Sequence, residues 1–213
     1  MVRVLIADDH PIVRKGLRQV LSEQPDMEIV EAENGSEALR RIDESKFNVV
    51  LLDLSMPGLS GLEVLSQIKA RQPEIPVLVL SGYPETEFAV RILRAGASGY
   101  LNKEMAPEEL MQAIRVVMSG RKYIGPAVAE LLANTLDGDR GELHASLSDR
   151  EFQVLLLIGA GKTVSEIAEQ IALSVKTVST YRARILEKMN LKNNAELMRY
   201  VIENKVGTDK AAR

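Results

Sequence analysis

Short apolar runs alternate with amphipathic stretches through the first 120 residues of the chain. Several runs are apolar at consecutive positions, which is typical of strands buried on both faces of a parallel sheet. They predict five β-strands, at residues 2–7, 27–32, 48–53, 76–81 and 98–101. The stretches between them carry apolar residues at helical spacing, for example at Val13, Leu17 and Val20. Alternating strands and helices predict an α/β domain built as a doubly wound, flavodoxin-like sheet of five parallel strands.

The pattern changes after residue 120, where glycine, proline and acidic residues predict a linker over residues 121–146. Beyond this linker the apolar spacing is helical, and each predicted helix is preceded by a residue that favours a helix start. The four predicted helices cover residues 149–160, 164–171, 175–189 and 194–204. Their N-cap residues are Ser148, Thr163, Ser174 and Asn193. The chain therefore divides into an α/β domain over residues 1–120 and an all-α, four-helix domain over residues 147–213.

The composition is that of an ordinary globular protein, with 46% hydrophobic and 27% charged residues. There is no cysteine, which excludes disulfides, thiolate catalysis and cysteine-based zinc sites. The two histidines leave little room for a histidine metal cluster or a Ser-His-Asp triad. No segment has the roughly 18–20 uninterrupted apolar residues of a membrane span, and the first acidic residues come too early for a secretory signal. We therefore expect a protein of the cytoplasm that contacts no membrane.

Charge is unevenly distributed along the chain. The whole sequence has a formal net charge of -3, but residues 143–213 carry 11 basic and 8 acidic side chains. A basic excess in the all-α segment favours contact with nucleic acid there, although the excess is small.

Charged and hydroxyl side chains follow the predicted strands at their carboxyl ends. These side chains belong to Asp8 and Asp9 after the first strand, Asp53 at the end of the third, Ser81 at the end of the fourth, and Lys103 after the fifth. In an open parallel sheet these strand ends meet at one edge, so the three carboxylates should lie close together. Their mutual repulsion requires positive charge, which Lys103 and a hard divalent cation such as Mg²⁺ would supply.

Four segments of the first domain resemble the receiver domain of two-component response regulators, over about residues 2–120. These segments are IADDHP, LLDLSMPGLSGLEVL, VLVLSG and GASGYLNK. The resemblance implies that Asp53 accepts a phosphoryl group from the phosphohistidine of a sensor histidine kinase. It also implies that Asp8, Asp9 and Asp53 hold Mg²⁺ together with the backbone carbonyl of Ser55.

The same resemblance assigns roles to three further side chains. Lys103 would neutralise charge in the transition state, and Ser81 would turn its hydroxyl towards the new phosphoryl oxygen. Tyr100 would then move into the vacated space and change the surface formed by the fourth helix, the fifth strand and the fifth helix. The alternative for Tyr100 is an ordinary core aromatic residue. His10, which follows the aspartate pair, is expected to be a solvent-exposed loop residue rather than a ligand.

The second domain resembles the LuxR-type helix-turn-helix of NarL/FixJ-type regulators, over about residues 147–206. The segment that carries the resemblance is LSDREFQVLLLIGAGKTVSEIAEQIALSVKTVSTYRARILEKMNLKNNAELMRYV. Residues 172–174 would form the turn, and the helix that begins at Val175 would be the recognition helix. With Val178 facing inward, Ile185 and Met189 fall on the same buried stripe at about 100° per residue.

The opposite, polar face of this helix should enter the major groove of double-stranded DNA. Contacts with base edges are expected from Ser179, Thr180, Ala183 and Arg184. Contacts with phosphates are expected from Lys176, Thr177 and Lys188, and Tyr181 and Arg182 could serve either purpose. The alternative is a polar, solvated helix face, against which the short turn and the local basic excess count.

Together these features favour a phosphorylation-gated transcription regulator rather than an enzyme, apart from Mg²⁺-dependent phosphorylation and dephosphorylation of the receiver itself. In this hypothesis the acyl phosphate releases the helix-turn-helix domain to form a homodimer on promoter DNA, and RNA polymerase is a further candidate partner. One alternative is a haloacid-dehalogenase-type phosphatase, which would need an acid where Ser55 stands. Another is a phosphorylation-independent DNA-binding protein that keeps the receiver as a dimerisation scaffold.

Overall fold

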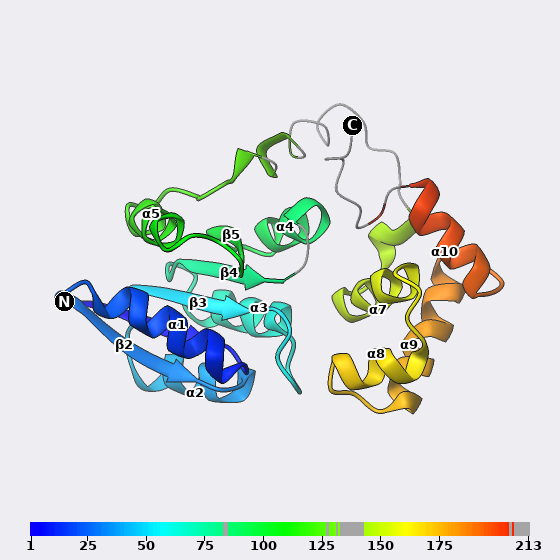
Figure 1. The fold of residues 1–213 in the computed structure, drawn as a ribbon, viewed down its shortest axis with the longest axis horizontal. Helices are drawn as coiled ribbons and strands as arrows, with labels where there is room; N and C mark the ends of the chain where they lie inside the picture. Colours follow the sequence, from blue (N-terminus) through cyan, green and yellow to red (C-terminus); the bar gives the residue numbers. More distant parts are fainter. Residues whose placement is uncertain (83–84, 127, 131, 133–142, 205, 207–213) are drawn as a thin grey trace. The chain divides into compact units, whose positions relative to one another are not determined.

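The computed structural model describes residues 1–82, 85–126, 128–130, 132, 143–204 and 206 (Figure 1). The chain forms two compact units, Met1–Leu132 and Ala133–Arg213. Within the described ranges, no helix is both long enough and apolar enough to cross a membrane. The middle of the expected linker, residues 133–142, lies outside the described part, so the domain boundaries expected from the sequence stay predictions.

A five-stranded sheet forms the centre of the first unit (Figure 1). Its strands are β1 Val2–Ala7, β2 Met27–Ala32, β3 Val49–Asp53, β4 Val77–Ser81 and β5 Gly99–Asn102. Their order across the sheet is β2-β1-β3-β4-β5, and every neighbouring pair is parallel. The order reverses between β1 and β3, where an open sheet of this kind offers a crevice at the carboxyl ends of its strands. The predicted doubly wound, flavodoxin-like fold is confirmed.

Helices alternate with these strands along the chain. They are α1 Pro11–Ser22, α2 Gly35–Glu44, α3 Gly61–Arg71, α4 Glu85–Arg94 and α5 Pro107–Met118. Helices α1 and α5 share a core with alternate strand residues, among them Val4 and Ile6 of β1. Leu5, between these two, is just as buried, because successive side chains of a strand point to opposite faces and both faces are covered. The consecutive apolar runs of the sequence therefore correspond to strands with no solvent-facing side.

The start of α3 is fitted closely against the end of β3. Ser60 and Glu63 form a capping box, in which the Glu63 carboxylate accepts the Ser60 N–H at 2.8 Å. The N–H of Gly61 donates to the Leu54 carbonyl at 3.0 Å. A Cβ added at Gly61 would lie only 2.2 Å from the carbonyl oxygen of Asp53. Glycine here allows the helix to approach the backbone that carries Asp53.

Helices make up the regular structure described in the second unit. They are the short 3₁₀ helix η1 Leu143–Ser146 and the α-helices α7 Asp149–Gly159, α8 Val164–Gln170, α9 Val175–Lys188 and α10 Asn194–Glu203. The α-helices carry the four N-caps expected from the sequence, with complete capping boxes at Ser148 and Thr163. The predicted all-α fold is confirmed, and each of these four α-helices begins and ends within one residue of its expected bounds.

A tight turn joins α8 to α9. Ala172 adopts a φ of 51°, a conformation that few non-glycine residues take, and Leu173 donates its N–H to the Ala168 carbonyl at 2.9 Å. Ile167 of α8 and Val178 of α9 are fully buried on either side of this turn. The turn and the shared core together fix which face of α9 is left to the solvent.

Candidate functional site

The carboxyl edge of the sheet gathers the charged residues that the sequence places at its strand ends. Asp8 follows β1 and Asp53 ends β3, and their side chains are 0% and 1% exposed. Lys103, which follows β5, places its Nζ 2.8 Å from Asp8 Oδ2 and 2.8 Å from Asp53 Oδ2. The Lys103 N–H also donates to the Ser81 carbonyl at 2.8 Å, which ties the lysine to the end of β4. Three strands therefore hold one ammonium group between two buried carboxylates.

Backbone N–H groups hold the remaining oxygens of the two buried carboxylates. Asp8 Oδ1 accepts the His10 N–H at 2.7 Å, and Asp53 Oδ1 accepts the Ser55 N–H at 3.1 Å. The Asp8 carbonyl accepts from Arg14 Nη1 at 2.8 Å, which fixes the loop between β1 and α1. Backbone hydrogen bonds thus fix the orientation of both carboxylates.

Burial and charge together perturb the acid and the base of this site. Burial raises the pKa of the Asp53 carboxyl; the Lys103 charge lowers it and the Asp8 charge raises it, which leaves a net increase. Burial acts to lower the pKa of Lys103, but the Asp53 and Asp8 carboxylates outweigh burial and raise it above its ordinary value. The lysine is therefore held in its charged form. Asp53 is an anion that its surroundings stabilise incompletely, which favours its reaction with an electrophile.

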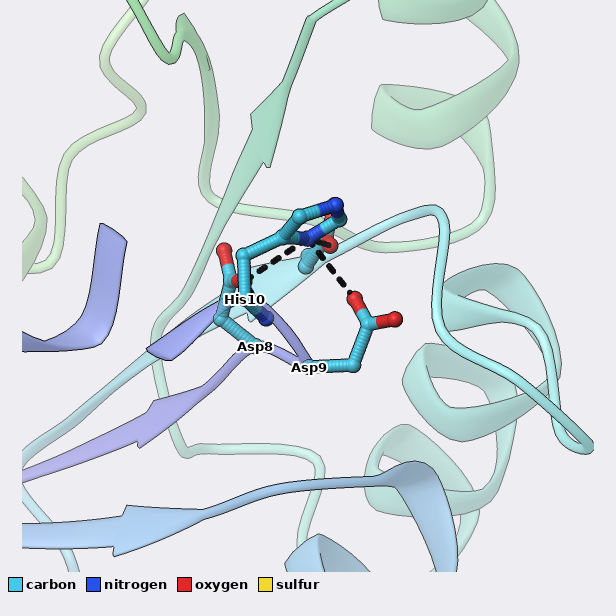
Figure 2. A group of neighbouring side chains, drawn as sticks. Asp8, Asp9 and His10 are labelled. Carbon is cyan, nitrogen blue, oxygen red and sulfur yellow. Dashed lines mark hydrogen bonds and ion pairs between the residues drawn. The ribbon is translucent and has the colours of Figure 1, made fainter. Parts of the chain in front are cut away.

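The loop after β1 adds an aspartate and a histidine to the same edge, as Figure 2 shows. The His10 Nδ1 atom lies 2.9 Å from Asp9 Oδ1, 3.3 Å from Asp8 Oδ1 and 3.8 Å from Asp53 Oδ2. The sequence predicts a solvent-exposed loop residue at this position. The side chain is 58% exposed, but its ring also faces the carboxylates, and this second property is missed by the sequence prediction. The available signal was its place directly after the aspartate pair.

Ser81 and Tyr100 lie in β4 and β5, the two strands that follow β3 across the sheet. Ser81 ends β4, Tyr100 lies in β5 opposite Val79, and both side chains are buried. Among the atoms that the structure describes, none beyond the chain neighbours lies within 4 Å of a Cβ added at Gly82. The burial of Tyr100 fits a core residue and equally a side chain that rearranges within the core, so its switch role stays a prediction.

Helix α9 of the second unit separates a buried stripe from an exposed polar face. Val178, Ile185 and Met189 are buried, as the helical spacing predicts. The exposed side chains are those of Val175, Lys176, Ser179, Thr180, Ala183, Arg184, Glu187 and Lys188, and Thr177, Tyr181 and Arg182 are half-buried at the flanks. The sequence prediction of DNA contacts omits Val175, an apolar side chain that is 50% exposed at the start of the helix.

Four of the side chains expected to contact DNA have partners within the unit. The Thr177 hydroxyl lies 2.8 Å from the Ser174 hydroxyl. Thr180 Oγ1 donates to the backbone carbonyl four residues earlier, at 3.0 Å. Arg182 Nε donates to Asn194 Oδ1, and Lys188 Nζ donates to Glu151 Oε2 at 2.6 Å. Lys188 therefore ties α9 to α7 in the free protein, whatever further contact it makes with a phosphate.

Glu151 connects the start of α7 with the end of α9. Its buried carboxylate accepts the Ser148 N–H at 2.7 Å and the Lys188 ammonium. Burial acts to raise the pKa of Glu151, but the hydrogen bonds from Lys188 and Ser148 outweigh it, and the pKa lies below its ordinary value. The ionised form of Glu151 therefore stabilises the unit that presents α9.

Two families of known proteins match this chain. Residues 4–115 match the response regulator receiver domain, and residues 145–201 match the bacterial regulatory proteins of the luxR family. The response regulator UvrY of Escherichia coli strain K12 is 38% identical over 207 residues, which cover 96% of this chain and 95% of UvrY. The response regulator GacA of Pseudomonas aeruginosa is 40% identical over 202 residues, covering 92% and 94% of the two chains. The chain belongs to the two-component response regulators.

Solved structures of the same family resemble this response regulator. RcsB from Salmonella enterica serovar Typhimurium, bound to promoter rprA in the presence of the phosphomimetic BeF3-, matches with a TM-score of 0.63 and 28% identity. The match covers 94% of this chain and 98% of that one. A second structure, an RcsB–DNA complex, matches with a TM-score of 0.58 over the same shares of the two chains. The family assignment from the sequence, a NarL/FixJ-type response regulator with a LuxR-type helix-turn-helix, is confirmed.

The acidic edge of this response regulator has donors that fit a hard divalent cation. Asp8, Asp9, His10 and Asp53 each offer one atom, and these atoms lie within 4.8 Å of one another. Carboxylate oxygens are the ligands that Mg²⁺ prefers, and Lys103 alone leaves the three carboxylates with an excess of negative charge. Receiver domains bind Mg²⁺ at an acidic pocket of this kind, and Asp8, Asp9 and Asp53 are the residues here that could hold it.

Proposed function

We propose that this response regulator takes a phosphoryl group from a sensor histidine kinase onto Asp53 and thereby controls the binding of its LuxR-type domain to promoter DNA. The observation that carries the proposal is the position of the Lys103 ammonium, 2.8 Å from both Asp8 and Asp53 at the carboxyl edge of the sheet. A phosphoryl group on Asp53 brings new negative charge into this buried pairing, which the rest of the domain must then accommodate.

The carboxylate of Asp53 is the nucleophile of the phosphotransfer. One of its oxygens attacks the phosphorus atom, the P–N bond to the kinase histidine breaks, and an acyl phosphate forms on Asp53. Lys103 remains charged and offsets the charge on the phosphoryl oxygens during the transfer. Mg²⁺ held by Asp8, Asp9, Asp53 and the Ser55 carbonyl would supply further charge neutralisation. Dephosphorylation uses the same groups and ends the signal: water attacks the phosphorus atom, the P–O bond to Asp53 breaks, and inorganic phosphate leaves.

The phosphorylated site changes the receiver through residues on β4 and β5. The Ser81 hydroxyl turns towards the phosphoryl oxygen, and Tyr100 moves into the space beside it. Both side chains are buried, in the adjacent strands β4 and β5, so a change in the orientation of either one requires the core around it to repack. This rearrangement alters the surface made by α4, β5 and α5 and releases the LuxR-type domain.

The exposed face of α9 supplies the contacts with DNA. The exposed side chains of Ser179, Thr180, Ala183 and Arg184 would meet base edges in the major groove, and those of exposed Lys176 and half-buried Thr177 would meet phosphates. One recognition helix with a modest basic excess has limited affinity, so binding is strengthened when two copies occupy paired half-sites. The structure of RcsB, a similar protein, bound to promoter DNA in the presence of a phosphomimetic supports a link between phosphorylation and DNA binding.

The test is the intact mass of the protein after incubation with acetyl phosphate and Mg²⁺. Wild type should gain one phosphoryl group and Asp53→Ala none. The matched control is Asp43→Ala, which removes an exposed aspartate that pairs with Arg71 on the surface and should leave phosphorylation unchanged. Each sample is then passed over a pool of DNA duplexes, and phosphorylated wild type should be retained more tightly than unphosphorylated wild type.

Two results would contradict the proposal. A phosphoryl group that persists in Asp53→Ala would place the acceptor elsewhere. No adduct, with equal retention of DNA by wild type and variant, would favour a DNA-binding protein that works without phosphorylation.

A further inference from the structure

The imidazole of His10 lies among the atoms that would bind the cation. Its Nδ1 is 2.9 Å from Asp9 Oδ1, 3.3 Å from Asp8 Oδ1 and 3.8 Å from Asp53 Oδ2. Figure 2 shows the ring turned over the loop towards the carboxylates rather than away from them. These distances describe a histidine that is part of the acidic cluster in space as well as in sequence.

The distances from His10 Nδ1 to the three carboxylate oxygens are compatible with ligands around one cation. Adjacent ligands of an octahedral cation with bonds of about 2.1 Å lie about 3 Å apart, and opposite ligands about 4.2 Å apart. Two of the His10 distances are close to the first value, and the distance to Asp53 Oδ2 falls between the two values. A single cation could therefore contact the Nδ1 atom and the carboxylates with little movement of the protein.

The backbone around His10 favours the same orientation. The His10 N–H donates to Asp8 Oδ1 at 2.7 Å, so one of the cluster's carboxylates also holds the histidine backbone. Pro11 begins α1 directly after it and restricts His10 to the extended conformation, with φ -91° and ψ 109°. The short loop between β1 and α1 therefore restricts the backbone that carries the imidazole beside the carboxylates.

We propose that His10 is a ligand of the divalent cation and gives this receiver an affinity for first-row transition-metal dications well above its affinity for Mg²⁺. Mg²⁺ binds oxygen ligands and gains little from an imidazole, whereas Ni²⁺ and Zn²⁺ bind imidazole nitrogen strongly. The site therefore accepts Mg²⁺ through its carboxylates alone and a transition-metal ion through the carboxylates and His10 together. The inference rests on the proposed function, because it takes the acidic cluster to be a cation site.

The experiment measures the binding of Mg²⁺ and of Ni²⁺ to the full chain by calorimetry. His10→Ala should weaken Ni²⁺ binding by about tenfold or more, because a nitrogen ligand is lost, and change Mg²⁺ binding by less than about twofold. The chain has two histidines, so His144→Gln serves as the matched control for imidazole binding elsewhere and should leave both affinities unchanged. Asp53→Asn should weaken both metals, because it removes a carboxylate that they share.

A second measurement reports ligation directly. In a protein labelled with ¹⁵N at histidine, Zn²⁺ should shift the ring-nitrogen resonance of His10 and leave that of His144 in place. Mg²⁺ should leave both resonances nearly unmoved, since the cation then contacts oxygen atoms only.

The outcomes separate this inference from the proposed function. Equal ratios of Ni²⁺ to Mg²⁺ affinity in wild type and His10→Ala would overturn the inference alone. A gain in affinity for both metals in His10→Ala would also overturn it, because His10 would then act as a competing positive charge. Failure of wild type to bind Mg²⁺ at all would instead contradict the Mg²⁺-assisted phosphorylation of Asp53.

Discussion

The acidic edge of the sheet buries its charged side chains, whereas helix α9 exposes most of its polar ones. Asp8 and Asp53 are almost inaccessible to solvent, and Lys103 contacts both of them at 2.8 Å. Along α9, Ser179 and Arg184 lie open to solvent. The buried charges at the sheet edge interact within the protein. Many exposed polar groups of α9 can instead interact with a binding partner.

This difference separates two ways in which a substitution acts. At the acidic edge, a substitution alters the balance of buried charges and so changes the stability of the domain together with its chemistry. On the exposed face of α9, a substitution removes contacts that exist only in the complex, so it changes affinity and leaves the fold nearly untouched. The following substitutions test this division, from the largest expected effect to the smallest.

Lys103→Gln should have the largest effect, since it removes the ammonium group that pairs with the two buried carboxylates of Asp8 and Asp53. We expect the free energy of unfolding of the receiver to fall by about 3 kcal/mol and phosphorylation of Asp53 to slow by about a hundredfold. Hydrogen exchange of the β3 amides and the rate of mass gain with acetyl phosphate measure the two effects. Lys46→Gln, an exposed lysine near the opposite edge of the sheet, is the control. If Lys103→Gln is as stable as wild type, the pairing of Lys103 with Asp8 and Asp53 contributes little to folding.

Gly61→Ala tests the packing that positions Asp53. The new Cβ would lie 2.2 Å from the Asp53 carbonyl oxygen and 2.6 Å from the Leu54 Cα, so the backbone of α3 or β3 must shift. We expect a loss of about 2–3 kcal/mol in thermal or urea unfolding and slower phosphorylation. Gly16→Ala in α1 meets no atom within 4 Å and should instead stabilise the domain by about 0.5–1 kcal/mol. Equal stability of the two variants would contradict the close approach at Gly61.

Arg184→Ala tests the exposed face of α9. Loss of a contact with a base edge should weaken binding to a selected duplex by about 1–3 kcal/mol, measured by fluorescence anisotropy at one salt concentration. The free energy of unfolding should change by less than about 0.5 kcal/mol. Arg199→Ala on α10, which is 76% exposed, should have little effect on DNA binding. If both variants weaken binding equally, Arg184 contributes only general positive charge.

The sequence predicts the acidic edge well because simple rules connect it with the fold. Consecutive apolar residues indicate strands buried on both faces, and parallel strands place their carboxyl ends together. Asp8, Asp53 and Lys103 are therefore brought together by topology, before any detail of packing is known. The helix starts are similarly local, because a capping box such as Ser60 with Glu63 depends on residues only three positions apart.

Contacts that depend on tertiary packing could not be predicted in this way. The His10 ring lies beside the Asp8 and Asp9 carboxylates in the folded loop, and the sequence does not specify this orientation. The pairing of Lys188 with Glu151 joins residues 37 positions apart, so a lysine expected to contact phosphate also holds two helices together. The orientation of a long surface side chain such as Lys188 depends on which charged group lies near it. That group is known only once the packing of the helices is known.

Glu151→Gln should produce the smallest of these effects and the most informative pH dependence. Because the pKa of Glu151 in the folded protein lies below its ordinary value, its stabilising effect is fully present above that ordinary value. The effect is then lost as the pH falls through the lowered pKa. We expect Glu151→Gln to lower the free energy of unfolding of the LuxR-type domain by about 1–2 kcal/mol at pH 7, and by less at acidic pH.

Unfolding measured by hydrogen exchange of the α7 and α9 amides at several pH values checks this prediction. Glu187→Gln, an exposed glutamate on the same helix as Lys188, is the control and should leave stability nearly unchanged. Lys188→Met should produce a loss with the same pH dependence, because it removes the partner that lowers the pKa of Glu151. A pH-independent loss in Glu151→Gln would mean that the carboxylate acts through its shape in the capping box and not through its charge. Lys188 would then be available to a DNA phosphate at no cost to the fold, like the exposed side chains elsewhere on the polar face of α9.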